Sequence, residues 1–175
     1  MRALIAIVIL IGLAAPARAA VVASSETGFE VREDVQIAAP PAKVYAAIGA
    51  IGRWWSSEHT YSHDARNLTL DLVGGGCQCE RLSGGGSARH MTVILAVPGQ
   101  LVRLEGALGP LATTGGTGHL TYALTPKDGG TALSVTYVFG GYASDGLAHW
   151  AGPVDGVLGV QIARLRRYVE TGKPD

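Results

Sequence analysis

Alternation of apolar and polar residues dominates the middle of the chain. In residues 29–37, FEVREDVQI, apolar side chains fall at every second position, which is typical of a half-buried strand. The same period recurs in six later segments, which turns rich in glycine or proline separate. These segments are 68–72, 77–82, 91–97, 101–106, 120–124 and 133–139. The rhythm predicts an antiparallel meander.

Two other parts of the chain follow a helical period. After Pro40 and Pro41, apolar residues at helical spacing predict short helices that end near Gly52. Near the C-terminus an apolar residue recurs every three or four positions, which predicts a long amphipathic helix. Its apolar stripe consists of Val154, Leu158, Ile162, Leu165 and Val169. The expected order is therefore one strand, two short helices, a strand meander and a long helix.

This order predicts an α+β fold. A helix with one apolar stripe and a sheet with one apolar face each need a cover. We therefore expect a curved antiparallel sheet of six to seven strands, wrapped around the C-terminal helix. Gly152, Gly156 and Gly159 thin that helix near its start. The thinning either allows a close approach to the sheet or leaves room for a guest molecule.

The first residues have the pattern of a signal peptide. A basic start at Arg2 precedes the apolar run 3–13, and small residues around Arg18 follow it. The run is shorter than the roughly 20 residues of a membrane-spanning helix. We expect residues 1–19 to be a signal peptide, 20–28 a flexible leader and 29–173 a single domain. The protein would then be exported, periplasmic or secreted, with no integral membrane segment after cleavage near Ala19.

Charge and composition narrow the class of partner. The chain has 14 basic and 14 acidic residues, without a basic run, so we expect no nucleic-acid partner. Only 16% of the residues are charged and 47% are hydrophobic. This balance favours a small hydrophobic molecule or lipid as the partner. Nothing in the pattern predicts an oligomeric state.

Three segments carry a resemblance to a known family. The stretch IAAPPAKVYAAIGAIGRWW at 37–55, the strand GTALSVTYVFGGY at 130–142 and the long final helix together resemble the SRPBCC superfamily. Its members include START lipid-binding domains, the birch-pollen allergen family and polyketide cyclases/dehydratases. The resemblance covers roughly residues 29–173 and is strongest to the cyclases and to bacterial relatives of the heat-shock-protein-90 ATPase activator. It implies a helix-grip fold with a deep cavity between the sheet and the C-terminal helix.

The densest group of chemically active side chains is WWSSEHTYSH, residues 54–63. Trp54 and Trp55 either line the pocket or plug one end of the core. His59 and Tyr61 either orient and protonate a carbonyl ligand or belong to a solvated loop. On the helix stripe, we expect Leu158 to contact the ligand.

Cys77 and Cys79 pose a geometric problem. Residues two apart on a strand lie about 6.6 Å apart on the same face, whereas a disulfide needs Cβ atoms about 3.8 Å apart. Free thiols, however, are uncommon in oxidising compartments. Either the strand is broken there or both thiols are shielded, and we prefer buried, inward-facing thiols that line the cavity. No spacing nominates further metal ligands, so we expect no metal site.

The alternation within each strand predicts which face of the sheet the other polar residues occupy. Glu33 falls on an apolar face; it is either a cavity acid with a raised pKa or, as we favour, reaches water through a bulge. His90 and His119 alternate with the apolar residues of their strands, so they should point outward, away from the core, unless a bulge changes the alternation. Tyr122 and Tyr137 point inward, where they fix a ligand's polar end or bond to each other or to backbone.

These features support three functional hypotheses. The leading one is an exported binding protein for a small hydrophobic ligand or lipid. The alternative is a cyclase-, dehydratase- or hydrolase-type enzyme with His59, Tyr61 or Glu33 as acid or base. A third is a protein-interaction module that uses the apolar loop 107–116. We expect no cofactor, because no glycine loop precedes a helix start in the phosphate-binding pattern.

Overall fold

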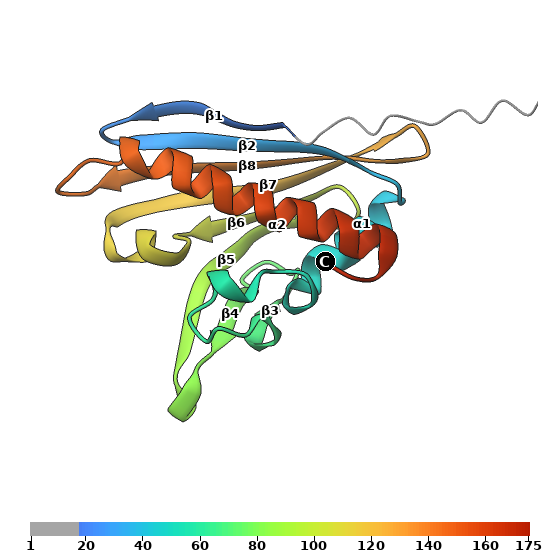
Figure 1. Ribbon diagram of the computed structural model, residues 1–175, viewed down its shortest axis with the longest axis horizontal. Coiled ribbons are helices and arrows are strands. Elements are labelled where there is room, and N and C mark those ends of the chain that lie inside the picture. Colours follow the sequence, from blue (N-terminus) through green and yellow to red (C-terminus); the bar gives the residue numbers. More distant parts are fainter. Residues whose placement is uncertain (1–17) are drawn as a thin grey trace, which may run out of the picture.

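The computed structural model describes residues 18–175, and eight strands of this part form one antiparallel sheet (Figure 1). Their order across the sheet is β1-β2-β8-β7-β6-β5-β4-β3. The strands are β1 (Arg18–Ser25), β2 (Gly28–Ile37), β3 (Leu68–Leu70), β4 (Cys77–Arg81), β5 (Ser87–Val97), β6 (Leu101–Gly106), β7 (Gly115–Lys127) and β8 (Gly130–Tyr142). The helices are α1 (Pro41–Gly49) and α2 (Ala151–Thr171). Short 3-10 turns are η1 (Ile51–Arg53), η2 (Ser57–His59), η3 (Ala65–Asn67), η4 (Ser83–Gly85), η5 (Gly109–Thr113) and η6 (Ala148–Trp150).

The predicted α+β helix-grip arrangement is confirmed, but the sheet has eight strands where six to seven were expected. The additional strand is β1, which pairs with β2. Residues 20–25 therefore belong to the sheet, and the expectation of a flexible leader there was wrong. The predicted signal peptide lies outside the described residues except for positions 18 and 19, which form the start of β1.

α2 lies across one face of the sheet (Figure 1), with its apolar stripe buried. All five stripe residues are buried, and Leu158 and Leu165 are almost completely removed from solvent. Burial of each such side chain stabilises the fold by about 1.5–3 kcal/mol relative to exposure. Gly172 ends the helix with a left-handed φ of 83°, and its N–H donates to the Tyr168 carbonyl at 2.8 Å. The stripe thus holds the helix against the sheet, as its period predicted.

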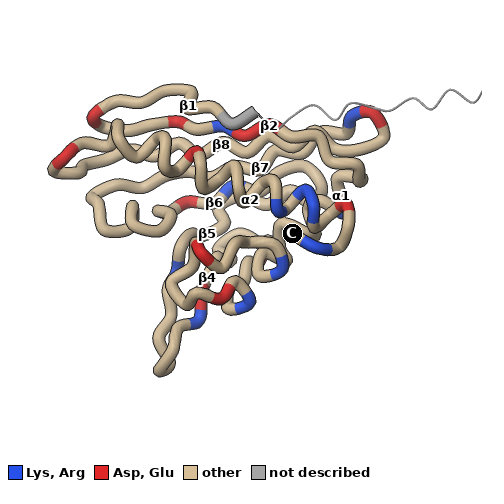
Figure 2. The backbone as a smooth tube through the Cα atoms, viewed as in Figure 1, with Lys and Arg blue, Asp and Glu red and all other residues tan. Residues whose placement is uncertain are grey.

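The charged side chains of α2 gather toward its C-terminal end. Figure 2 shows basic residues near the C-terminus of the chain, where Arg164, Arg166 and Arg167 follow one another closely. Cations are favoured at that end because the helix dipole is negative there. Among the described residues, no helix is long and apolar enough to cross a membrane.

β5 contains a β-bulge that changes which side chains face inward. β4 pairs Gln78 with Met91 but the next residue, Cys79, with Arg89, so His90 is an extra residue in β5. A bulge of this kind breaks the alternation of side chains. Gly106, at the end of β6, lies against the bulge with a φ of 152°, and a Cβ there would come within 2.5 Å of the His90 carbonyl oxygen. Only glycine fits this close approach.

Candidate functional site

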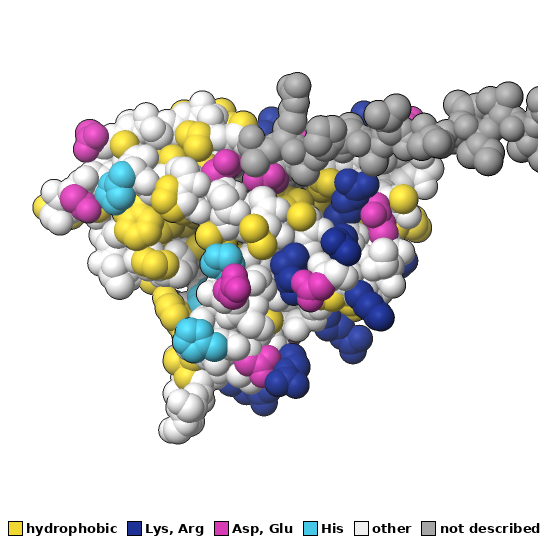
Figure 3. Space-filling model, viewed as in Figure 1, with side chains coloured by type: hydrophobic (Ala, Val, Ile, Leu, Met, Phe, Trp, Pro, Cys, Tyr) yellow, Lys and Arg dark blue, Asp and Glu magenta, His cyan; other side chains and the backbone are white. Residues whose placement is uncertain are grey.

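A cavity of about 410 Å³ lies between the first half of α2, the η5 segment and the inner face of β3, β4 and β5. Most of its wall is aromatic or aliphatic: Trp55, Leu68, Leu108, Pro110, Leu111, Trp150, Pro153, Val154, Val157 and Leu158. The polar part of the wall consists of Glu58, His59, Thr60, Tyr61, Gln78 and His90. Figure 3 shows hydrophobic and histidine side chains on the same face of the molecule, while Lys and Arg gather toward the C-terminus. The cavity has the character of a site for an apolar molecule with a polar group.

Four of the sequence-predicted ligand-binding residues lie in this wall. They are Trp55, His59, Tyr61 and Leu158. The Trp55 indole N–H donates to the His59 carbonyl at 2.9 Å, which fixes the loop beneath the cavity. Their contact with a ligand stays a prediction, but the structure brings them together.

Trp54 and the two inward tyrosines lie elsewhere. Trp54 is fully buried and its indole N–H donates to the Ala47 carbonyl at 2.7 Å, so it plugs the core. Tyr137 donates to the Gly106 carbonyl at 3.1 Å and accepts from the Leu108 N–H at 3.3 Å. Burial raises the pKa of both Tyr122 and Tyr137. Neither tyrosine lines the cavity; Tyr137 instead anchors the start of the loop that does.

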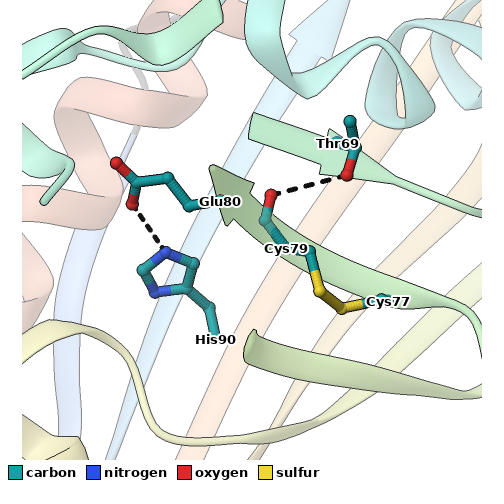
Figure 4. The surroundings of a disulfide bond; sticks show 5 residues. All are labelled: Thr69, Cys77, Cys79, Glu80 and His90. Atoms are coloured by element: carbon teal, nitrogen blue, oxygen red, sulfur yellow. Dashed lines mark hydrogen bonds and ion pairs between the residues drawn. A yellow bond between two sulfur atoms is a disulfide. The ribbon is translucent and has the colours of Figure 1, made fainter. Parts of the chain in front are cut away.

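The two cysteines form a disulfide, so the preferred expectation of free, inward-facing thiols was wrong. Their Cα atoms are 5.3 Å apart, within disulfide range and shorter than the spacing of a regular strand. Figure 4 shows the bridge and the Glu80 side chain directed to opposite sides of β4. Gln78 and Glu80, which alternate with the cysteines, take the buried positions. Cys77 and Cys79 therefore do not line the cavity.

Glu33 points into the protein, so the favoured expectation that a bulge brings it to water was wrong. Only 1% of its surface is exposed, and neither carboxylate oxygen has a hydrogen-bond partner among the described residues. Burial, followed by the nearby charges of Asp155 and Asp34, raises the pKa of Glu33 to about 7. This is the raised-pKa alternative, yet Glu33 does not line the cavity that His59 and Tyr61 line.

A buried glutamine of α2 holds His59. Gln161 is completely buried; its side-chain oxygen accepts from the Ser56 N–H at 2.8 Å. Its side-chain nitrogen lies 3.0 Å from His59 Nδ1. The helix that closes the cavity thereby also orients one of the polar groups in its wall.

His90 forms a buried pair with Glu80, which corrects the expectation that His90 points outward. The bulge in β5 turns the imidazole inward, and Nε2 lies 2.8 Å from the Glu80 carboxylate (Figure 4). The histidine side chain is 9% exposed and that of Glu80 is fully buried. His119, the other histidine expected to point outward, is exposed as predicted.

The Glu80 carboxylate is stabilised in its charged form. Burial acts to raise its pKa, but hydrogen bonds from Ser62, His90 and Tyr61 outweigh burial, and the net shift is downward. The Ser62 N–H donates at 2.6 Å and the Tyr61 N–H at 3.1 Å. The Tyr61 ring stacks on His90 with a centroid distance of 5.2 Å, and its hydroxyl donates to the Gly109 carbonyl at 3.0 Å. Loop 54–63 therefore closes over the His90–Glu80 pair.

Several residues of the site escaped the sequence reasoning. Gln78 and Glu80 alternate with Cys77 and Cys79. Because cysteine is the more hydrophobic residue type, the sequence reasoning expected the cysteines to face inward. Nothing in the sequence around Trp150 and Gln161 indicated that they belong to the site. In loop 107–116, Leu111 is 1% exposed, and both it and Leu108 line the cavity. The apolar loop thus folds back onto the body, which removes the exposed tip that the interaction hypothesis needed.

Comparisons with solved structures show the same fold. CalU16 from Micromonospora echinospora has a TM-score of 0.59 at 14% identity, over 91% of this chain and 86% of that one. The Aha1 dimer from Colwellia psychrerythraea has a TM-score of 0.53 at 18% identity, over 82% and 98% of the two chains. A protein from Chromobacterium violaceum has a TM-score of 0.55 at 22% identity, over 81% and 96%.

A comparison with curated proteins finds no match. The model of the family described as polyketide cyclase / dehydrase and lipid transport, in contrast, matches residues 28–170. This range runs from the start of β2 almost to the end of α2 and includes every residue of the cavity wall. The chain therefore belongs to the polyketide cyclase / dehydrase and lipid transport family of the SRPBCC superfamily.

Proposed function

We propose that this chain is an exported protein that holds a small hydrophobic molecule or lipid in the cavity beneath α2. The observation that carries the proposal is the composition of the cavity wall, which is largely aromatic and aliphatic with a few polar groups. Its volume of about 410 Å³ falls in the range of sites for small organic ligands, roughly 300–1,000 Å³. Transfer of apolar surface from water into such a wall gains about 25 cal/mol per Å².

Binding is favoured over the acid–base alternative because the predicted acid–base residues do not meet. His59 and Tyr61 line the cavity, but Glu33 does not, and the Tyr61 hydroxyl is bonded to the Gly109 carbonyl. An acid–base mechanism needs its groups within about 3 Å of one reacting position. The three candidates therefore do not form a catalytic set.

The binding proposal is tested by filling the cavity. Val157 lies in the cavity wall, whereas Val160, on the same helix, is 46% exposed and lies outside it. Val157→Trp should weaken binding of the neutral fluorescent probe N-phenyl-1-naphthylamine at least tenfold, and Val160→Trp should not. Fluorescence titration measures both affinities, and urea unfolding verifies that both variants fold. Equal affinities in folded variants would place the probe elsewhere and overturn the proposal.

Export is part of the proposal and has its own test. The N-terminal pattern and the disulfide, which is typical of oxidising compartments, support it. Expression of the full chain in a bacterial host should yield a periplasmic protein whose intact mass corresponds to a first residue of Ala20. Replacement of Ala17 and Ala19 by leucine should block this processing. A full-length protein retained in the cytoplasm would contradict the export proposal and leave ligand binding untouched.

A further inference from the structure

The polar part of the cavity wall carries information about the ligand beyond its hydrophobicity. Two histidines and one glutamine contribute to it: His59, His90 and Gln78. Their partners elsewhere in the structure settle which ring nitrogens carry hydrogen. Those hydrogens in turn decide which ligand groups fit.

The tautomer of His59 follows from its link to Gln161. The Ser56 N–H can only donate, so the Gln161 atom that faces it at 2.8 Å is the oxygen. The Gln161 amino group therefore faces His59 Nδ1 at 3.0 Å and donates to it. Neutral His59 must then carry its hydrogen on Nε2. Because Nδ1 is occupied by Gln161, Nε2 is the nitrogen that can donate a hydrogen bond to a ligand.

His90 has the complementary arrangement. Its Nε2 lies 2.8 Å from a carboxylate that accepts from two backbone N–H groups, so Nε2 donates to Glu80. Neutral His90 is then left with a lone pair on Nδ1, and no described residue donates to this atom. A carboxylate partner strengthens the acceptor capacity of the other ring nitrogen. The Tyr61 ring stacked on His90 holds the imidazole in place.

Gln78 adds an unpaired amide to the same wall. The residue is 3% exposed, lines the cavity and makes no side-chain hydrogen bond with any described residue. The amide is therefore free to exchange a hydrogen bond with a ligand in the cavity.

The charges near this wall exclude an anionic ligand. Glu58 is in the cavity wall and the Glu80 carboxylate lies directly behind His90, while the wall contains no Lys or Arg. A carboxylate ligand would meet two negative groups without a compensating cation. A neutral group that both donates and accepts a hydrogen bond fits, and a hydroxyl is the simplest such group.

From this geometry we infer that the cavity selects a neutral hydrophobic molecule that bears a hydroxyl group, which donates its hydrogen bond to His90 Nδ1. The donors of His59 and Gln78 serve the hydroxyl oxygen or another acceptor of the ligand. The inference rests on the proposed binding function and names the ligand class. Phenols and alcohols with a fused-ring or alkyl body belong to this class, whereas their ethers and carboxylates do not.

The test compares three probes of the same shape: 2-naphthol, 2-methoxynaphthalene and 2-naphthoate at pH 8. Isothermal titration calorimetry on the wild-type protein should give about tenfold tighter binding for 2-naphthol than for the ether, the effect of one hydrogen bond to a buried acceptor. Naphthoate should bind more weakly than both. The variant His90→Phe should bind the alcohol and the ether equally, and His119→Phe, on the exposed face of β7, should keep the preference.

A measurement on the wild-type protein covers the case in which His90→Phe does not fold. The ¹⁵N resonance of His90 Nδ1 should shift when 2-naphthol is added and stay in place when the ether is added. Equal binding of alcohol and ether by the wild-type protein, or an unchanged Nδ1 resonance, overturns the inference and leaves the binding proposal standing. Failure of every neutral probe to bind overturns both.

Discussion

Cys77 and Cys79 are bridged across a single residue, and their Cα atoms are 5.3 Å apart. Two residues of regular strand span about 6.6 Å, so β4 is shortened at this point. Opposite the shortened segment, β5 carries its extra residue, His90. A contracted strand paired with a bulged strand explains how His90 comes to face Glu80.

The first prediction concerns this disulfide. In the double variant Cys77→Ser, Cys79→Ser, β4 can relax toward regular strand spacing, and the bulge that turns His90 inward should loosen. The loop closed by the bridge is very short, so the loss of stability should be only about 1.5 kcal/mol. Urea unfolding measures that loss, and the ¹⁵N and ¹H resonances of His90 report its contact with Glu80. Unaltered His90 resonances in the double variant would show that the bulge does not depend on the bridge.

The second prediction concerns the pH dependence of stability. The folded pKa of Glu33, about 7, lies above the ordinary value of 4.5, so the folded protein binds a proton more tightly than the unfolded chain. The free energy of unfolding should therefore fall as the pH rises from about 4.5 to about 7, by on the order of 3 kcal/mol. Unfolding curves at several pH values test this fall.

Two variants isolate Glu33 as the origin of the fall. Glu33→Gln should remove most of it, whereas Glu30→Gln, three positions earlier on β2, should keep it. Asp155→Asn should make the fall smaller, since the charge of Asp155 contributes to the raised pKa. A fall of the same size in Glu33→Gln would assign it to other groups.

The third prediction concerns the bridge from α2 to loop 54–63. Gln161→Leu leaves the Ser56 N–H buried without its acceptor and should destabilise the protein by about 1–3 kcal/mol. His59→Ala removes only the other end of the bridge and should cost less, because the bond from Ser56 to Gln161 survives. Urea unfolding of both variants compares these losses. Equal losses would mean that the bond to Ser56 contributes nothing measurable.

The fourth prediction separates two buried tyrosines. Tyr137→Phe removes a donor to the Gly106 carbonyl and an acceptor for the Leu108 N–H, at the start of the loop that lines the cavity. It should lower stability by about 1–2 kcal/mol and weaken probe binding, because Leu108 is part of the cavity wall. Tyr122→Phe is the matched control, since no hydrogen bond of its hydroxyl is found within the described residues. A larger loss for Tyr122→Phe would contradict this assignment.

Much of the fold could be read from periodicity. Val154, Leu158, Ile162, Leu165 and Val169 predicted α2 because helical spacing aligns them on one side, and that side alone is buried. The alternation in residues 29–37 predicted β2 for the same kind of reason. β1 went unrecognised, since its short alanine-rich sequence RAAVVASS has no alternation and depends on pairing with β2.

The site was harder to predict, because bulges and partners are set by neighbouring strands. The alternation of residues within β5 places the His90 side chain on the outer face of the sheet. Only the pairing of β5 with β4 reveals the bulge that turns it inward. Glu80 is buried because Tyr61 and Ser62, almost 20 positions earlier, supply N–H donors to its carboxylate. A residue's own type and spacing contain neither fact.

The sequence by itself thus determined an antiparallel sheet covered by a long C-terminal helix, because these follow from local periods of apolar residues. The resemblance to the SRPBCC superfamily added the helix-grip fold with its cavity, and residue type alone pointed to the aromatic loop 54–63. Tertiary structure alone decided that Gln78 and His90 enter the cavity wall and that Gln161 holds His59. The reason is physical: a polar side chain can be buried only where hydrogen-bond partners meet it, and here those partners come from distant segments.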